Sequence, residues 1–172
     1  DHRDLHSFPT RRSSDLMIQD SDIIEERHRR FIRTVCDSEI VYGLENKEGF
    51  ATSSSMEHED ENGDPIVIIC FWAEEALAKS CITEDWSDYR ISPISLSDFL
   101  ENWCVGMEND GLLVGTEFDQ NMFGHEVNPL ELILELLKEL KSKGKDLSLN
   151  KFEGISDLKK QVKNIVENKA SS

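Results

Sequence analysis

A segment in the second half of the chain gathers side chains that could perform acid–base chemistry. Glu117, Asp119, His125 and Glu126 lie close together, in what the sequence predicts to be a loop after a strand. Two carboxyl groups, or a carboxyl group and a histidine, act as general acid and base when one pocket separates their pKa values. Because carboxylates are abundant throughout this chain, the grouping is equally typical of a polar surface loop. A small enzyme using the Glu117–Glu126 loop is therefore the alternative interpretation, and we assign no catalytic residue.

Metal and nucleophile motifs are incomplete. Asp60, Asn62 and Asp64 open like a calcium-binding loop, but the sixth and twelfth positions hold Pro65 and Phe71 instead of Gly and Glu. No Cys or His pair has the spacing of a zinc site, and no glycine-rich phosphate loop occurs. We therefore expect no metal site and no cofactor. The four cysteines all lie in apolar or helical contexts, where burial as reduced thiols is expected: Cys36, Cys70, Cys81 and Cys104.

An aromatic side chain interrupts a second polar loop, Thr83–Tyr89. Trp86 lies there between Asp85 and Asp88. An exposed aromatic residue ringed by acids is typical of a protein-binding hot spot, whereas a loop tryptophan can also fold back onto the core. The candidate binding residues are those of this loop together with two residues of the first segment: Trp86, Asp85, Asp88, Tyr89, Asp119 and His125.

The charge balance narrows the partner class. The formal net charge is −16, and residues 17–142 carry 28 acidic and 9 basic side chains, a net charge of −19. Such a field repels nucleic-acid backbones and anionic lipid, and it attracts cationic surfaces. We expect a basic protein as partner, with no nucleic acid and no membrane; the oligomeric state stays open. Four of the nine bases lie close together, and Glu25 and Glu26 precede Arg29 and Arg30 by four residues, which favours a solvated, self-paired helix face.

The elements that must position these residues follow from hydrophobic periodicity and capping signals. Helices are predicted over 22–37, 73–81, 96–109 and from Pro129 to a cap at Gly144. Strands are predicted over 39–44, 50–54, 65–72, 89–94 and 112–118. The run 65–72 is continuously apolar, which indicates a strand covered on both faces. The fold class is therefore α+β, with a mixed, mostly antiparallel sheet of about five or six strands and three or four helices.

The chain divides into three parts. Residues 1–16 resemble the translation of a sequencing adaptor, so we expect this segment to be disordered and Met17 to be the natural start. Residues 17–142 form the acidic domain, and residues 143–172 form a tail that carries a short, weakly amphipathic helix over 155–167. No stretch approaches the roughly 18 apolar residues of a transmembrane helix. With unpaired cysteines and no export signal, a cytoplasmic location is expected.

A family resemblance accounts for much of this order of elements. The blocks VYGL, IICFW, ISPISLSDFLENWCVGMENDGLLVGTEFD and EVNPLELILELLKEL span residues 40–140. In this order they resemble the bacterial family called domain of unknown function 2750. Two positions depart from that family's pattern, since a Pro often replaces Ala73 and a Trp often replaces Phe118. The resemblance implies the fold and a bacterial origin, and it implies no active site.

These observations favour a non-catalytic, acidic protein-binding module of the inhibitor or immunity type. The charge of residues 17–142 and the aromatic residue in the Thr83–Tyr89 loop motivate this hypothesis.

Overall fold

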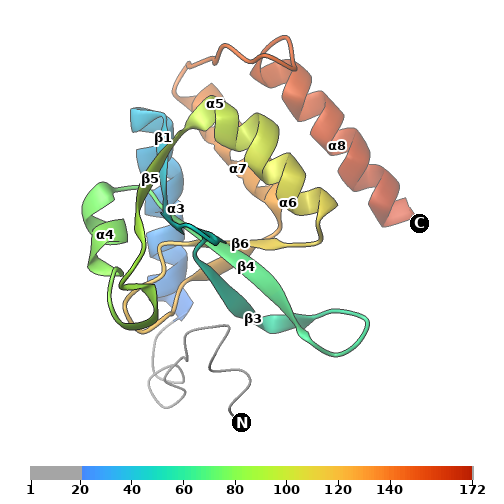
Figure 1. The fold of residues 1–172 in the computed structure, drawn as a ribbon. Helices are drawn as coiled ribbons and strands as arrows, with labels where there is room; N and C mark the ends of the chain where they lie inside the picture. The colour runs from blue at the N-terminus through green and yellow to red at the C-terminus, as the bar shows by residue number, and fades with distance from the viewer. Residues whose placement is uncertain (1–20, 172) are drawn as a thin grey trace.

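The structure is a computed structural model that describes residues 21–171 (Figure 1). The adaptor-like segment 1–16 and Met17 lie outside the described residues, so the expectations about them stay predictions. The described elements, in chain order, are α3 (Ser21–Ser38), β1 (Ile40–Asn46), β2 (Gly49–Phe50), β3 (Thr52–Glu59), β4 (Pro65–Trp72), α4 (Glu75–Ser80), the 3-10 turn η1 (Glu84–Trp86), β5 (Arg90–Ser95), α5 (Leu96–Asp98), the π-helical segment η2 (Phe99–Cys104), α6 (Val105–Asn109), β6 (Leu113–Thr116), β7 (His125–Val127), α7 (Pro129–Ser142) and α8 (Ile155–Ser171).

One mixed sheet organises these elements. Within the described residues it has seven strands in the order β2-β1-β4-β6-β7, with β3 paired to β4 and β5 paired to β1. Every pairing is antiparallel except that of β4 with β6, where Ile68 lies opposite Leu113 and Phe71 lies opposite Thr116. The α+β class and the mostly antiparallel sheet are thus confirmed, with slightly more strands than predicted. Two of the strands, β2 and β7, are only two and three residues long.

Strand β4 is buried on both faces, as its apolar run predicts. Phe71 belongs to one hydrophobic core, whereas Ile68, Cys70 and Trp72 belong to a second core on the opposite face. Because successive strand residues point to opposite faces, one short strand supplies both cores. Its central position and the helix layer that covers the first core are visible in Figure 1.

The first core is covered by the long helices. Buried residues of α3, α7 and α8 pack there with those of the continuous helix formed by α5, η2 and α6. Leu158 and Val162 of α8 are among them, at 0% and 3% exposure. Asn128 caps the amino end of α7, where its side-chain oxygen accepts hydrogen bonds from the backbone N–H groups of Leu130 and Glu131.

The second core lies under the short α4 and η1. Ala78, Cys81 and Trp86 close it, together with Phe118 and Met122 of the loop that follows β6. Trp86 is 4% exposed and makes edge-to-face contacts with Trp72 and Tyr89. Of the two alternatives for Trp86, an exposed anchor and a side chain packed on the core, the structure therefore shows the second. The tryptophan folds back onto the core, because the apolar face of β4 needs cover on this side.

Some predicted boundaries change. The predicted strand 50–54 is divided between β2 and β3, and β3 continues to Glu59, because a register shift after Ser54 lets it pair with the start of β4. The strand predicted to reach Phe118 ends at Thr116. His125 and Glu126 lie on strand β7 and not in a loop, because β6 offers its free edge to them.

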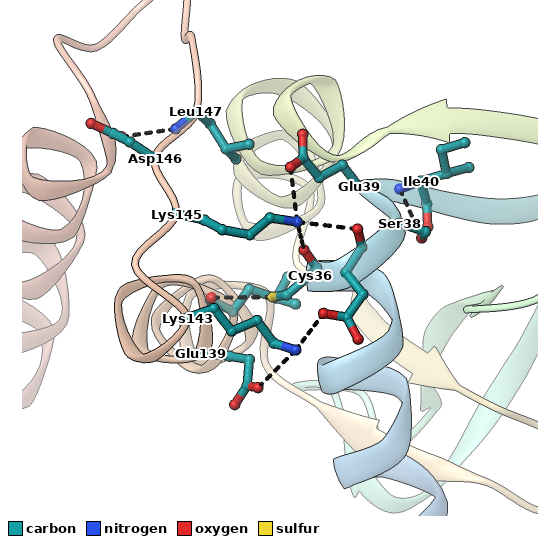
Figure 2. A network of polar contacts seen from close by, with 11 residues as sticks. Cys36, Ser38, Glu39, Ile40, Glu139, Lys143, Lys145, Asp146 and Leu147 are labelled. Carbon is teal, nitrogen blue, oxygen red and sulfur yellow. Dashed lines mark hydrogen bonds and ion pairs between the residues drawn. The ribbon is translucent and has the colours of Figure 1, made fainter.

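The carboxyl end of α3 is capped by residues far away in the sequence (Figure 2). This helix has no basic residue in its own last turn. Lys145 supplies the charge instead, donating to the carbonyls of Cys36 at 2.8 Å and Asp37 at 3.1 Å while pairing with Glu39 at 3.1 Å. Terminal carbonyls of a helix lack intrahelical partners and carry partial negative charge. The chain turns toward them through Gly144 at φ 69°.

This cap predicts a measurable stability cost. Replacing Lys145 with Met leaves two helix-end carbonyls and Glu39 without their cation. We expect the free energy of unfolding to fall by about 1–2 kcal/mol in urea denaturation. Lys138→Met on the exposed side of α7 is the matched control and should change it by less than about 0.5 kcal/mol. Equal effects of the two substitutions would contradict a capping role.

Candidate functional site

The candidate site begins where β6 ends. Thr116 is the last residue of the strand, and Glu117 adopts a left-handed backbone conformation at φ 55°. A non-glycine residue in this region is strained and persists only when its surroundings hold it. Side chains of the second core fix the backbone at this point. The indole Nε1 of Trp72 donates to the carbonyl of Phe118 at 2.9 Å, and the thiol of Cys81 lies 3.4 Å from the same oxygen.

Asp119 organises the loop that follows. Its Oδ1 accepts hydrogen bonds from the backbone N–H groups of Asn121 at 2.9 Å and Phe123 at 3.1 Å. An aspartate that binds backbone groups two and four residues ahead fixes a compact turn. The turn brings Gly124 against the ring of Phe118, which is 2% exposed. The loop is therefore a rigid wall and not a flexible tip.

A cavity of about 330 Å³ opens between this wall and helix α3. It combines charged, polar and apolar side chains. Those that matter for chemistry are Arg27, Arg30, Glu117, Asp119, Ser80 and Trp72. One ion pair joins the two sides of the cavity: Nη1 of Arg27 on α3 lies 3.4 Å from Oδ2 of Asp119 in the loop.

Glu117 is a buried carboxyl group in this cavity. Burial raises its pKa from 4.5 to about 7, because the charged form loses its hydration. The backbone N–H of Ala73, 3.1 Å from Oε2, and the positive charges of Arg30 and Arg27 act in the opposite direction. Glu117 thus changes its protonation state near neutral pH, which is the property required of a general acid or base.

A second cavity of about 490 Å³ lies on the other side of the same loop. It is lined by His125 and Glu126 of β7, together with Ile24, Met56 and Phe123. Burial, and next the neighbouring His28, lower the pKa of His125 from 6.5 to about 4. This imidazole is therefore neutral at physiological pH.

His28 holds the two sides of the loop together. Its ring stacks on that of His125 at a centroid distance of 4.0 Å. Nδ1 lies 2.8 Å from Oγ1 of Thr116, and Nε2 lies 2.9 Å from Oε1 of Glu135. His28 is 5% exposed and lines neither of the two cavities. This histidine–carboxylate pair therefore ties α3 to β6 and α7.

The four residues of the predicted acid–base cluster are divided between the two cavities. Glu117 and Asp119 line the first, whereas His125 and Glu126 line the second. The carboxylate of Glu126 is also bound to strand β3: it accepts hydrogen bonds from the hydroxyl of Ser55 at 2.5 Å and from the backbone N–H of Met56 at 3.0 Å. The second cavity thus holds a histidine beside a carboxylate that β3 already engages, whereas the carboxyl group with the raised pKa, Glu117, lies in the first cavity without a histidine among its described lining residues.

The other candidate binding residues surround the buried Trp86. Asp85 and Asp88 are exposed, and Oδ2 of Asp88 accepts a hydrogen bond from Nδ2 of Asn46 at 3.2 Å. Tyr89 is half-buried against Trp86, and burial raises its pKa above 10.0. This surface is acidic, and its aromatic side chains face inward.

Sequence reasoning missed Arg27 and Arg30. The arginine cluster is predicted to pair with acids on the helix itself. Arg29 and Arg33 do so, with Glu26, whereas Arg27 turns toward the loop. The sequence does carry a signal for Arg27. Position 27 lies three residues after Ile24 and four before Phe31, which places a charged residue on the apolar face of the helix.

The thiols offer no reactive group. All four cysteines are buried and outside disulfides, as predicted. Burial raises the pKa of Cys36 to about 12 and that of Cys81 to about 11, so neither forms a thiolate at neutral pH. Among residues 21–171, no cluster of three His, Cys, Asp or Glu side chains is placed to hold a metal ion. In the same range, no helix has the length and apolar character needed to cross a membrane.

Comparison with known proteins identifies the family. The model of the family described as "Protein of unknown function (DUF2750)" matches residues 28–136. The chain belongs to the DUF2750 family. No curated protein and no solved structure matches it.

The DUF2750 match covers most of the sheet and both cavity walls built by β6 and β7. Glu117, Asp119 and His125 fall inside it, whereas Arg27 lies one residue before its start and α8 lies beyond its end. The matched region therefore contains Glu117 and Asp119, the two carboxyl groups of the first cavity. Of the two arginines of that cavity, Arg30 lies inside the match and Arg27 just before it.

The tight packing of the loop gives the next prediction. A Cβ on Gly124 would lie 2.2 Å from Cδ1 of the buried Phe118 ring, which cannot move without disturbing the second core. Gly124→Ala should lower the free energy of unfolding by about 1–3 kcal/mol in urea denaturation. Gly106→Ala is the control, since nothing lies within 4 Å of its added methyl group. It should stabilise α6 by about 0.5–1 kcal/mol.

Glu117 gives a prediction about pH. Its folded-state pKa of about 7 exceeds the unfolded value of 4.5. Its stabilising contribution is thus fully present below pH 4.5 and is lost as the pH rises through 7. Glu117→Gln stays neutral and avoids this loss. The variant should match the wild type near pH 4.5 and exceed its free energy of unfolding by about 3 kcal/mol near pH 8. Urea titrations at both pH values measure the difference, and a difference independent of pH would contradict a buried, neutral carboxyl group.

Proposed function

We propose that this DUF2750 protein is a non-catalytic acidic module, of the inhibitor or immunity type, that binds a basic protein through the β3–β4 hairpin. The hairpin extends from the sheet, away from the layer of long helices (Figure 1). No Lys or Arg occurs from Ala51 to Ala78. The carboxylates near the tip are all exposed: Glu57, Glu59, Asp60, Glu61 and Asp64.

The observation that carries the proposal is that these five carboxylates are unpaired. In the part of the chain that the structure describes, none of them forms an ion pair. Oδ1 of Asp60 accepts backbone hydrogen bonds from Asn62 and Asp64, which holds the tip in one shape. Unpaired charge on a fixed turn steers a cationic partner and contributes to specificity. Met56, 48% exposed beside the tip, adds an apolar contact.

The alternative, an enzyme using the Glu117–Glu126 loop, has weaker support. Its histidine and the carboxyl group of Glu117 line different cavities. Asp119 shares the first cavity with Glu117, but its oxygens are engaged by the backbone N–H groups of Asn121 and Phe123 and by Arg27. Protein binding needs no such juxtaposition. The four buried cysteines, all outside disulfides, fit a reducing compartment, so the proposal includes a cytoplasmic location.

The test compares two charge-reversed variants of the full chain. Glu57→Lys/Glu59→Lys/Glu61→Lys reverses the hairpin tip. Glu74→Lys/Glu75→Lys/Asp85→Lys makes the same charge change on exposed residues around α4 and η1. Affinity capture from bacterial lysate with quantitative mass spectrometry should show basic proteins reduced about tenfold or more by the hairpin variant. The control should retain most of them.

Salt dependence provides the second readout. Capture by the wild type should weaken as ionic strength rises, because screening shortens the range of the hairpin charges. If only the control variant with Glu74, Glu75 and Asp85 reversed lost capture, the contact surface would lie around Asp85, and the proposed role of the hairpin would be contradicted. Capture that resists both variants and salt would contradict the proposed function itself.

A further inference from the structure

The guanidinium group of Arg27 has an unused edge. Its Nη1 is near Asp119, but Nε and Nη2 are closed to water and donate to no partner among the described residues. The N–H bonds of Nε and Nη2 point the same way in a planar guanidinium group, and together they form the fork that holds a carboxylate or phosphate with two parallel hydrogen bonds.

Such an unused fork is costly. Buried polar groups in native proteins nearly always have hydrogen-bond partners, and a charged donor removed from water without one destabilises the fold. This chain has 35 acidic residues, and none of the described ones accepts from Nε or Nη2. The nearest carboxylate, that of Asp119, already holds the backbone N–H groups of Asn121 and Phe123 with its other oxygen. The edge is therefore poised for an acceptor from outside residues 21–171.

The charges around the cavity indicate what kind of acceptor fits. Arg27 and Arg30 contribute two positive charges, and Asp119 contributes one negative charge. With Glu117 protonated, the lining is left with one positive charge. A ligand with a single negative charge neutralises it, whereas a phosphate dianion would meet two carboxyl groups at close range. The remaining wall is mixed, with Trp72 and Leu77 apolar and Ser80 and Asn121 polar.

We propose that the cavity of about 330 Å³ binds a small organic monocarboxylate, whose two oxygens accept from Nε and Nη2 of Arg27 while Arg30 closes over it. The volume lies at the lower end of the range for small-molecule sites. Because the fork is closed to water, the ligand must displace a side chain to reach it. Arg30 lines the same cavity, is exposed and forms no ion pair within residues 21–171, so its side chain is free to rearrange around the ligand. This site does not depend on protein binding by the hairpin.

Titrations of the ¹⁵N-labelled full chain followed by NMR test the ligand class. The probes are acetate, lactate, inorganic phosphate and the neutral analogue acetamide. Acetate and lactate should produce saturable shifts at the Arg27 Nε–H and at the backbone amides of Ala73 and Asn121. Acetamide should produce none, and phosphate should bind at least tenfold more weakly than acetate. Absence of a saturable shift with either carboxylate, or tighter binding of phosphate, overturns the proposal.

Variants test the geometry. Arg27→Lys keeps the positive charge but removes the fork, so the dissociation constant for lactate should rise about tenfold or more. Arg29→Lys is the matched control, because Arg29 is exposed on the same helix and paired with Glu26. It should leave the constant unchanged. Arg30→Gln, at an exposed position that tolerates substitution, should weaken binding severalfold. Circular dichroism checks the fold of each variant, and unchanged binding in both Arg27→Lys and Arg30→Gln overturns the site.

Discussion

Burial of β4 on both faces is the constraint on which the other elements depend. Its alternating residues feed two separate cores, so the chain must provide a layer of cover on each side. The long helices cover one side. On the other, α4 and η1 are short, and the loop after β6 completes the cover with Phe118 and Met122. That loop is therefore fixed by the hydrophobic core before any role in binding is considered.

The same constraint places the first cavity. Strands β4 and β6 run parallel, so their carboxyl ends meet at one edge of the sheet. The chain leaves β4 at Ala73 and β6 at Glu117, and the hydrogen bond between the Ala73 N–H and the Glu117 carboxyl group joins the two exits. Loops that diverge from neighbouring parallel strands leave a space between them, which is why ligands bind at such edges in other sheets. Here α3 closes the space and brings its arginines to it.

Much of the fold could be predicted from the sequence, because long periodic segments and caps are local signals. The run 65–72, the helix from Pro129 with its Asn128 cap and the glycine at position 144 depend on neighbouring residues alone. Strand β7 could not be predicted, since three residues carry no periodicity and the edge of β6 decides their conformation. The direction in which Trp86 points was also undecidable locally, because it depends on the uncovered face of β4.

The candidate site was harder to predict than the fold because it is made of exceptions to local rules. Helical spacing places Arg27 on an apolar face, where a charged residue is unfavourable unless the other side of the space compensates it. Glu117 is buried although carboxylates avoid burial, and its pKa of about 7 results from two opposed causes: burial raises it, and the arginines and the Ala73 N–H lower it. Proton occupancy of Glu117 therefore sets the net charge of the cavity at neutral pH. The cavity of this acidic chain is cationic only while Glu117 carries its proton, and a pKa of about 7 keeps that proton in place up to the neutral range.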